Sequence, residues 1–269
     1  MIDTAGNVSV LCIVDNVTGV TQLYDVVYMV CWRSSTITRF NATTRQQLTN
    51  IDVSDLRRPC DIVAWDRTSQ LYVVDYPEYV WRVSTDGTDI KHWLPKSPDD
   101  TLKPSKLSVT STRLLVTSLH TRQLRQFDAD GDELRRVQLP HHMRPRHAVE
   151  SPTGTFIVSL LNTQLKEDQI VEVNTGGEVL RQFSGSRLTS LVSTQHVAVD
   201  SHGNTLVADS NNGCILLLDN LLFLRRIIID EHQLNYKQPR RLCYREDKGQ
   251  LLVGLWKENA VAVFDVLCR

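Results

Sequence analysis

Six short apolar segments recur along the chain at a nearly regular spacing. They are Val27–Val30, Leu71–Val74, Leu114–Val116, Thr155–Val158, Leu206–Ala208 and Leu252–Gly254. Their first residues lie about 40 to 50 positions apart, which is the period of the blades of a β-propeller. Each segment has the length of a β-strand and is too short for an ordinary helix. The pattern therefore predicts six copies of one β-rich unit.

Each apolar segment leads into a second strand in which apolar and polar residues alternate. These strands are Ile37–Asn41, Val80–Ser84, Leu124–Asp128, Ile170–Asn174, Ile215–Asp219 and Val261–Asp265. Glycine turns follow, as at Thr85–Gly87, where a hairpin requires a positive φ. A third strand follows most turns. A fourth precedes the last five apolar segments and is often opened by a proline, which the first position of a strand tolerates.

Four antiparallel strands in each unit are the content of a propeller blade. We therefore predict an all-β fold, a six-bladed β-propeller of four-stranded antiparallel blades, with residues 1–269 in one domain. The sixth blade lacks an outer strand, and we expect Asn7–Val14 to complete it, because an open ring would expose a sheet edge. The first blade leaves little room before Tyr28, so its inner strand is either displaced to Val17–Leu23 or damaged.

The fifth unit carries the most specific motif. Residues 196–212 read HVAVDSHGNTLVADSNN. This stretch resembles an NHL repeat, with Ser201–Asn204 matching its inner turn and Val207–Asp209 its second strand, and weaker copies cover residues 52–265. The resemblance to the NHL domains of TRIM-NHL proteins implies a six-bladed propeller. It also implies a face that binds single-stranded RNA.

The overall composition is that of an ordinary globular domain. Apolar residues make up 41% of the chain, yet no run approaches the roughly 20 apolar residues of a membrane helix, so we expect no membrane partner. The start, Met1–Asn7, has no basic segment followed by an apolar one, which favours a cytoplasmic location or a fragment of a longer secreted chain. The six cysteines show no metal-binding spacing and are interpreted as reduced core thiols. A monomeric domain is expected.

Charged residues divide unequally between the two faces of the predicted ring. We call the basic face the one that carries the loops from each outer strand to the next inner strand, together with the turns between the two middle strands. Acidic residues dominate the other face, where few bases are expected. Our candidate ligand-binding residues lie at the tunnel mouth of the basic face: Asp61, Lys106, Arg144, Arg146, His147, His196, Arg240 and Arg241. The formal net charge of −1 conceals this polarity.

Histidines suggest a metal or an acid–base group near the tunnel, because His147 and His196 open consecutive inner strands and His141 and His142 lie close by. No H-x-E or H-E-x-x-H pattern supports this interpretation, and Lys106 would repel a cation. We therefore predict no metal, no cofactor and no catalytic residue.

The sequence thus favours a non-enzymatic interaction platform that binds a protein, or an acidic or anionic ligand, on the basic face. Two alternatives remain open at this point. One is single-stranded RNA binding through the same face, as the TRIM-NHL resemblance implies. The other is a metal-dependent hydrolase or lyase centred on the tunnel.

Overall fold

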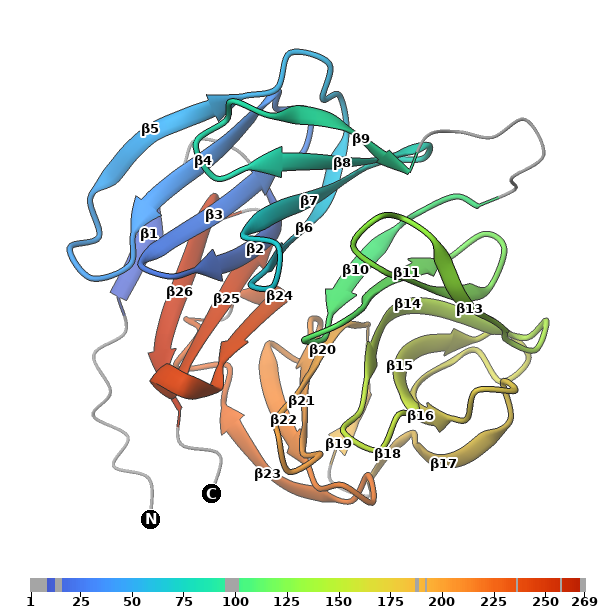
Figure 1. Cartoon of the computed structure of the whole chain (residues 1–269). Coiled ribbons are helices and arrows are strands. Elements are labelled where there is room, and N and C mark those ends of the chain that lie inside the picture. Colours follow the sequence, from blue (N-terminus) through green and yellow to red (C-terminus); the bar gives the residue numbers. More distant parts are fainter. Residues whose placement is uncertain are drawn as a thin grey trace.

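The chain forms a ring of six four-stranded antiparallel sheets around a central axis (Figure 1). This computed structural model describes residues 9–12, 16–94, 102–186, 189–191, 193–235, 237–256 and 258–266. Within these residues there is no α-helix, only the short 3-10 turn η1 (Glu246–Lys248). The prediction of a six-bladed, all-β propeller is therefore confirmed. No helix of the described residues is long and apolar enough to cross a membrane.

The first three blades follow one another along the chain, each running from the axis outward. Blade 1 contains β2 (Val17–Leu23), β3 (Val26–Cys31), β4 (Thr36–Asn41) and β5 (Gln47–Asp52). Blade 2 contains β6 (Pro59–Trp65), β7 (Gln70–Asp75), β8 (Tyr79–Ser84) and β9 (Ile90–Leu94). Blade 3 contains β10 (Lys106–Val109), β11 (Leu114–Ser118), β12 (Gln123–Phe127) and β13 (Glu133–Gln138).

The other three blades repeat this order, and the last takes its outer strand from the N-terminal region. Blade 4 contains β14 (Met143–Glu150), β15 (Phe156–Asn162), β16 (Glu167–Val173) and β17 (Val179–Phe183). Blade 5 contains β20 (Thr194–Val199), β21 (Thr205–Asp209), β22 (Cys214–Leu218) and β23 (Leu224–Ile229). Blade 6 contains β24 (Gln238–Arg245), β25 (Gln250–Trp256), β26 (Ala260–Asp265) and β1 (Ser9–Cys12). A ribbon of β18 (Gly185–Ser186) and β19 (Thr189–Ser190) lies between blades 4 and 5 in sequence.

Strand β1 closes the ring as predicted. It pairs antiparallel with β26, so that Leu11 lies opposite Val261 and Val10 opposite Ala262. Leu11 is 2% exposed and packs in the apolar cluster shared by blades 6 and 1, whereas Val10 is 49% exposed. The other residues of the predicted closing segment, 7, 8, 13 and 14, lie outside the described residues.

The inner strand of blade 1 is displaced rather than damaged. Strand β2 occupies Val17–Leu23, the first of the two predicted alternatives, and all seven residues are buried. Gly19 permits this position because a Cβ there would lie 2.7 Å from the backbone nitrogen of Ile62 in blade 2. A side chain at this point would push the two blades apart.

Six apolar clusters hold the ring together, one between each pair of neighbouring blades. Successive side chains of a strand pack against different neighbouring blades, because they alternate between the two faces of the sheet. In β7, Leu71 and Val73 pack toward blade 1, and Tyr72 and Val74 pack toward blade 3. This explains why the six apolar segments are continuous runs: both faces of the strands that contain them are buried.

The closing strand provides a test of ring stability. We expect Leu11→Ala to lower the free energy of unfolding by about 2–4 kcal/mol, because it opens a cavity between blades 6 and 1. The neighbouring Val10→Ala, on the exposed side of the same strand, should change it by less than about 0.5 kcal/mol. Urea unfolding measures both. Equal effects of the two substitutions would contradict the closure.

Candidate functional site

Five of the six inner strands bring one polar side chain to the axis at the same ladder position. Each of these residues lies opposite an equivalent position of the adjacent strand in its blade. Asp61 is paired with Val74 of β7, and His196 with Ala208 of β21. Blade 1 has Gly19 at this position, opposite Val30. The other five residues form what we call the axial cluster: Asp61, Lys106, His147, His196 and Arg241. The structure thus assembles five of the eight predicted site residues.

The two histidines of the axial cluster stack on one another. Their ring centroids are 3.5 Å apart at an interplanar angle of 19°. The backbone N–H of Val197 donates to Nδ1 of His147 at 3.3 Å, so Nε2 of His147 carries the proton and donates to the carbonyl of Leu107 at 3.0 Å. Burial lowers the pKa of His147 to about 4 and that of His196 well below its ordinary value. Both imidazoles are therefore neutral at pH 7.

Arg241 of blade 6 forms hydrogen bonds that connect blades 6, 1 and 2 at the axis. Its guanidinium donates to the carbonyl oxygens of Thr18, of Cys60 at 3.0 Å and of Arg240 at 2.8 Å. Its Nε also lies 3.7 Å from Oδ1 of Asp61, whose Oδ2 accepts the backbone N–H of Leu107 at 2.9 Å. Because both charged groups are buried, each depends on this network.

Lys106 lies beside this pair and also donates to the carbonyl of Cys60. The Lys106 side chain is partly exposed to solvent. Loss of hydration at the axis and the positive charge of Arg241 lower its pKa to about 8. Burial also raises the pKa of the Cys60 thiol to about 11, so this sulfur is protonated at neutral pH and is a poor nucleophile.

The axial cluster has the spacing of a metal site but not its chemistry. Asp61, His147 and His196 each offer one atom within 4.8 Å of the others. However, backbone groups occupy both ring nitrogens of His147, and a metal ligand must offer a free lone pair. The cations Lys106 and Arg241 lie at the same position and would oppose a bound metal ion. These residues do not fit a metal centre.

The remaining three candidate residues lie above the cluster, toward the basic face. Arg146 pairs with Asp168 at 2.8 Å and donates to Oγ of Ser193 at 3.2 Å. Arg240 stacks its guanidinium over the ring of Trp256, with Cζ 3.7 Å from the centroid. Arg144 is exposed, and no described carboxylate lies at ion-pair distance from Arg144 or Arg240. The predicted site is thus a largely buried cluster with one exposed cation, Arg144, and two partly buried cations above it, rather than one open mouth.

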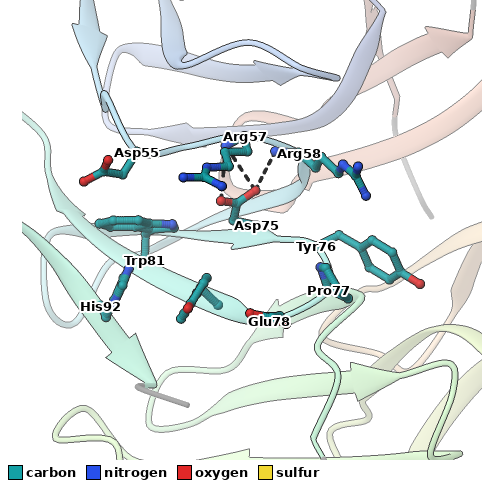
Figure 2. A pocket seen from close by; sticks show the side chains of 10 residues that line it. Asp55, Arg57, Arg58, Asp75, Tyr76, Pro77, Glu78, Trp81 and His92 are labelled. Carbon is teal, nitrogen blue, oxygen red and sulfur yellow. Dashed lines mark hydrogen bonds between the residues drawn. The ribbon is translucent and has the colours of Figure 1, made fainter.

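A pocket that the sequence reasoning missed lies on the same face (Figure 2). Its volume is about 440 Å³. We call it the inter-blade pocket, because its residues come from the loop after β5 and from blade 2: Asp55, Arg57, Arg58, Asp75, Tyr76, Pro77, Glu78, Tyr79, Trp81 and His92. The hint in the sequence is Asp75, which occupies in blade 2 the position that Asp209 has in blade 5 and which binds the loop that precedes its blade.

Asp75 fixes the rim of this pocket. Its carboxylate accepts the backbone N–H of Arg57 at 3.1 Å and that of Arg58 at 2.5 Å, interactions drawn in Figure 2. The guanidinium groups of both arginines are left exposed. Tyr79 stacks on His92 with centroids 4.4 Å apart, and Trp81 meets the same imidazole edge-on at 4.0 Å.

The opposite face is hollow at the axis and is less acidic than the sequence suggests. Two adjoining cavities of about 1040 and 870 Å³ open there, lined by the ends of the inner strands. The expectation of few bases on this face is wrong: Arg113, just before β11, pairs with Glu150 at 2.6 Å, and Arg245, at the end of β24, pairs with Asp247 at 3.0 Å. The acids of this face are thus partly paired with bases.

Comparison with known proteins supports the fold. No family model matches the chain, and no curated protein matches it in sequence. Among solved structures, a streptogramin B lyase superposes with a TM-score of 0.69 at 11% identity, over 97% of this chain and 98% of that one. A catalytically inactive virginiamycin B lyase variant from Staphylococcus aureus, with quinupristin, gives 0.69 at 12% identity over 97% and 100%.

A chain of a nidogen/laminin complex gives a TM-score of 0.64 at 14% identity over 84% of each chain. These similarities place the protein in the class of six-bladed β-propellers. They do not extend to the NHL family, which no family match supports.

The buried histidine predicts a pH dependence of stability. An unfolded histidine has a pKa near 6.5, so below that pH the unfolded chain binds a proton that the folded His147, with its pKa of about 4, does not. Stability is full above pH 6.5 and declines as the pH falls toward 4. We expect His147 to account for a loss of about 2 kcal/mol between pH 7.5 and 5.

Urea unfolding at both pH values tests this expectation. His147→Gln should reduce the pH-dependent loss by that amount, whatever its effect on stability at pH 7.5. His202→Gln is the matched control, because the His202 side chain is 75% exposed and should not contribute. A full wild-type loss in His147→Gln would show that another group is responsible.

Proposed function

We propose that this protein is a non-enzymatic interaction platform whose basic face binds an acidic segment of a protein partner. The residues that carry this role are Arg144, Arg146 and Arg240, with Lys106 and Arg241 of the axial cluster beneath them. The observation that supports the proposal most directly is uncompensated positive charge on a rigid support. An acidic segment supplies the missing negative charges.

Arg240 demonstrates this excess of charge. Burial, together with the positive charges of Arg241 and Arg146, lowers its pKa to about 10. Among these five cations the described structure contains two carboxylates as ion-pair partners, Asp61 and Asp168. Like charges held close together are costly unless a ligand compensates for them.

The axial cluster does not favour an enzyme. His147 uses both nitrogens in backbone hydrogen bonds, and Cys60 is held as a thiol, so neither is poised as a base or nucleophile. The similarity to lyases is at 11–12% identity and concerns the fold, which carries many unrelated functions. We therefore do not assign a hydrolase or lyase activity.

Single-stranded RNA is less well supported than a protein. Binding without sequence preference needs open aromatic faces on which bases stack. Trp256 is covered by Arg240, and Tyr76 is bonded through its hydroxyl to Nε2 of His120 at 2.5 Å. Around the axial arginines the described residues offer charge without an open row of stacking platforms, and Tyr79, Trp81 and His92 are gathered in the inter-blade pocket instead.

Charge reversal tests the proposed face. We expect Arg144→Glu/Arg240→Glu to weaken the binding of a fluorescein-labelled deca-glutamate peptide at least about tenfold, as two attractive charges become repulsive. The matched control is Arg45→Glu/Lys91→Glu, which makes the same change in net charge in the turn before β5 and on β9. Fluorescence anisotropy at low salt measures both variants and a uridine decamer as competitor.

Two outcomes would contradict the proposal. Equal weakening by the control variant would show that binding follows net charge instead of the named face. Tighter binding of the uridine decamer than of the peptide would favour RNA as the ligand.

Lys106 predicts a pH dependence of the same binding. With a pKa of about 8 it is largely charged at pH 7 and largely neutral at pH 9. Affinity for the acidic peptide should therefore fall several-fold over this interval. Lys106→Arg keeps its charge and should abolish the fall, whereas Lys106→Met should bind weakly at both pH values. A wild-type fall that persists in Lys106→Arg would exclude Lys106 as its origin.

A further inference from the structure

We propose that the inter-blade pocket binds an anionic oxygen group, a carboxylate or a phosphate, carried on an aromatic or apolar stem. This is a second site, distinct from the axial arginines. None of its lining residues belongs to the axial cluster or to the cations above it. The inference therefore stands whether or not the proposed platform function is correct.

The first observation is an unpartnered donor at the pocket. Trp81 is 7% exposed, and its indole Nε1 is buried without a hydrogen-bond partner among the described residues. Figure 2 shows the indole at the pocket with its nitrogen turned toward the side where Asp75 and Arg57 lie. A buried N–H without an acceptor costs about 1–3 kcal/mol, so a ligand oxygen placed there restores a lost interaction.

The second observation is the charge at the rim. Asp75 is engaged by the backbone N–H groups of Arg57 and Arg58, which fixes both residues at the pocket. No carboxylate of the described chain lies at ion-pair distance from either guanidinium. A guanidinium pairs best with the planar oxygens of a carboxylate or the oxygens of a phosphate.

The third observation is the aromatic wall. The parallel stack of Tyr79 on His92 and the edge contact of Trp81 form a packed surface that needs no rearrangement to receive a flat or apolar group. A volume of 440 Å³ matches a small ligand or one large side chain. The wall therefore selects the stem, and the donors select the charged end.

Two exposed acids limit what the pocket accepts. Asp55 and Glu78 lie at different ends of the rim (Figure 2) and oppose a free, strongly charged anion. An anion whose stem packs on the aromatic wall gains contacts that inorganic phosphate lacks. We therefore expect phenyl phosphate or phenylacetate to bind more tightly than inorganic phosphate.

The indole N–H resonances provide a direct measurement. The chain has five tryptophans, and Trp81→Phe identifies the resonance of Trp81 in a ¹⁵N correlation spectrum. We expect saturable shifts of this resonance with phenyl phosphate and phenylacetate, while the buried Trp65, away from both proposed sites, serves as the internal reference. The tighter of the two probes identifies phosphate or carboxylate as the preferred group. Benzylamine, the cationic counterpart, should produce no saturable shift.

Variants separate the contributions of the donors. Arg57→Ala/Arg58→Ala should weaken the binding of both anions about tenfold or more. The shift of the Trp81 resonance measures this affinity. Trp81→Phe keeps an aromatic ring but removes the indole N–H. It should weaken the binding of both anions about three- to tenfold, measured by the shifts of the His92 resonances. The dispersion of the remaining indole signals reports whether each variant is folded.

Three results would overturn the inference. The first is no saturable shift at up to about 10 mM of either anionic probe. The second is binding of benzylamine as tight as that of the anions, which would make the pocket an aromatic site for cations. The third is loss of the shift in Arg144→Glu/Arg240→Glu, which would place anion binding at the axial arginines. If this variant keeps the shift of the Trp81 resonance but no longer binds the acidic peptide, the result would support two separate sites.

Discussion

Packing between neighbouring blades is the interaction on which the rest of this structure depends. Every blade buries both of its faces, so that adjacent residues of one strand, such as Tyr72 and Val73, contribute to different interfaces. No blade can bury its apolar surface alone, and the last interface forms only when both ends of the chain meet. Leu11 of β1 lies in that final interface, between blades 6 and 1. Closure is therefore a condition of the fold.

Ring geometry also determines the electrostatics of the axis. Five of the six inner strands place a polar residue at the same position near the axis, and four of these side chains are buried. Burial there favours neutral imidazoles at His147 and His196, while Arg241 stays charged by donating to three carbonyl groups. The axial cluster is thus a structural support for the blades. Its cations contribute potential to the face above without being freely accessible.

The two proposed binding sites lie on the basic face. Arg144 and Arg240 present positive charge near the axis, where we propose that an acidic segment binds. The inter-blade pocket offers a shaped site with an aromatic wall and one buried donor, Trp81. Both rest on loops that the packed blades hold in place. The same ring occurs in a lyase and in a chain of a nidogen/laminin complex, so such surface features, rather than the fold, distinguish the function.

The amino-acid sequence by itself determined the six blades, the closing strand and the two possible positions of the first inner strand. These features are periodic, and strand alternation and turn chemistry are local properties that can be read along the chain. It also identified the five residues of the axial cluster, because equivalent positions of a repeat must converge. The sequence could not determine how accessible the eight candidate site residues are, since exposure depends on neighbours from other blades. Asp61 and His147 are buried, whereas Arg144 is exposed. Only the tertiary structure decided that Trp81, His92 and Arg57 share a pocket, because this proximity arises from the packing of a loop against the next blade.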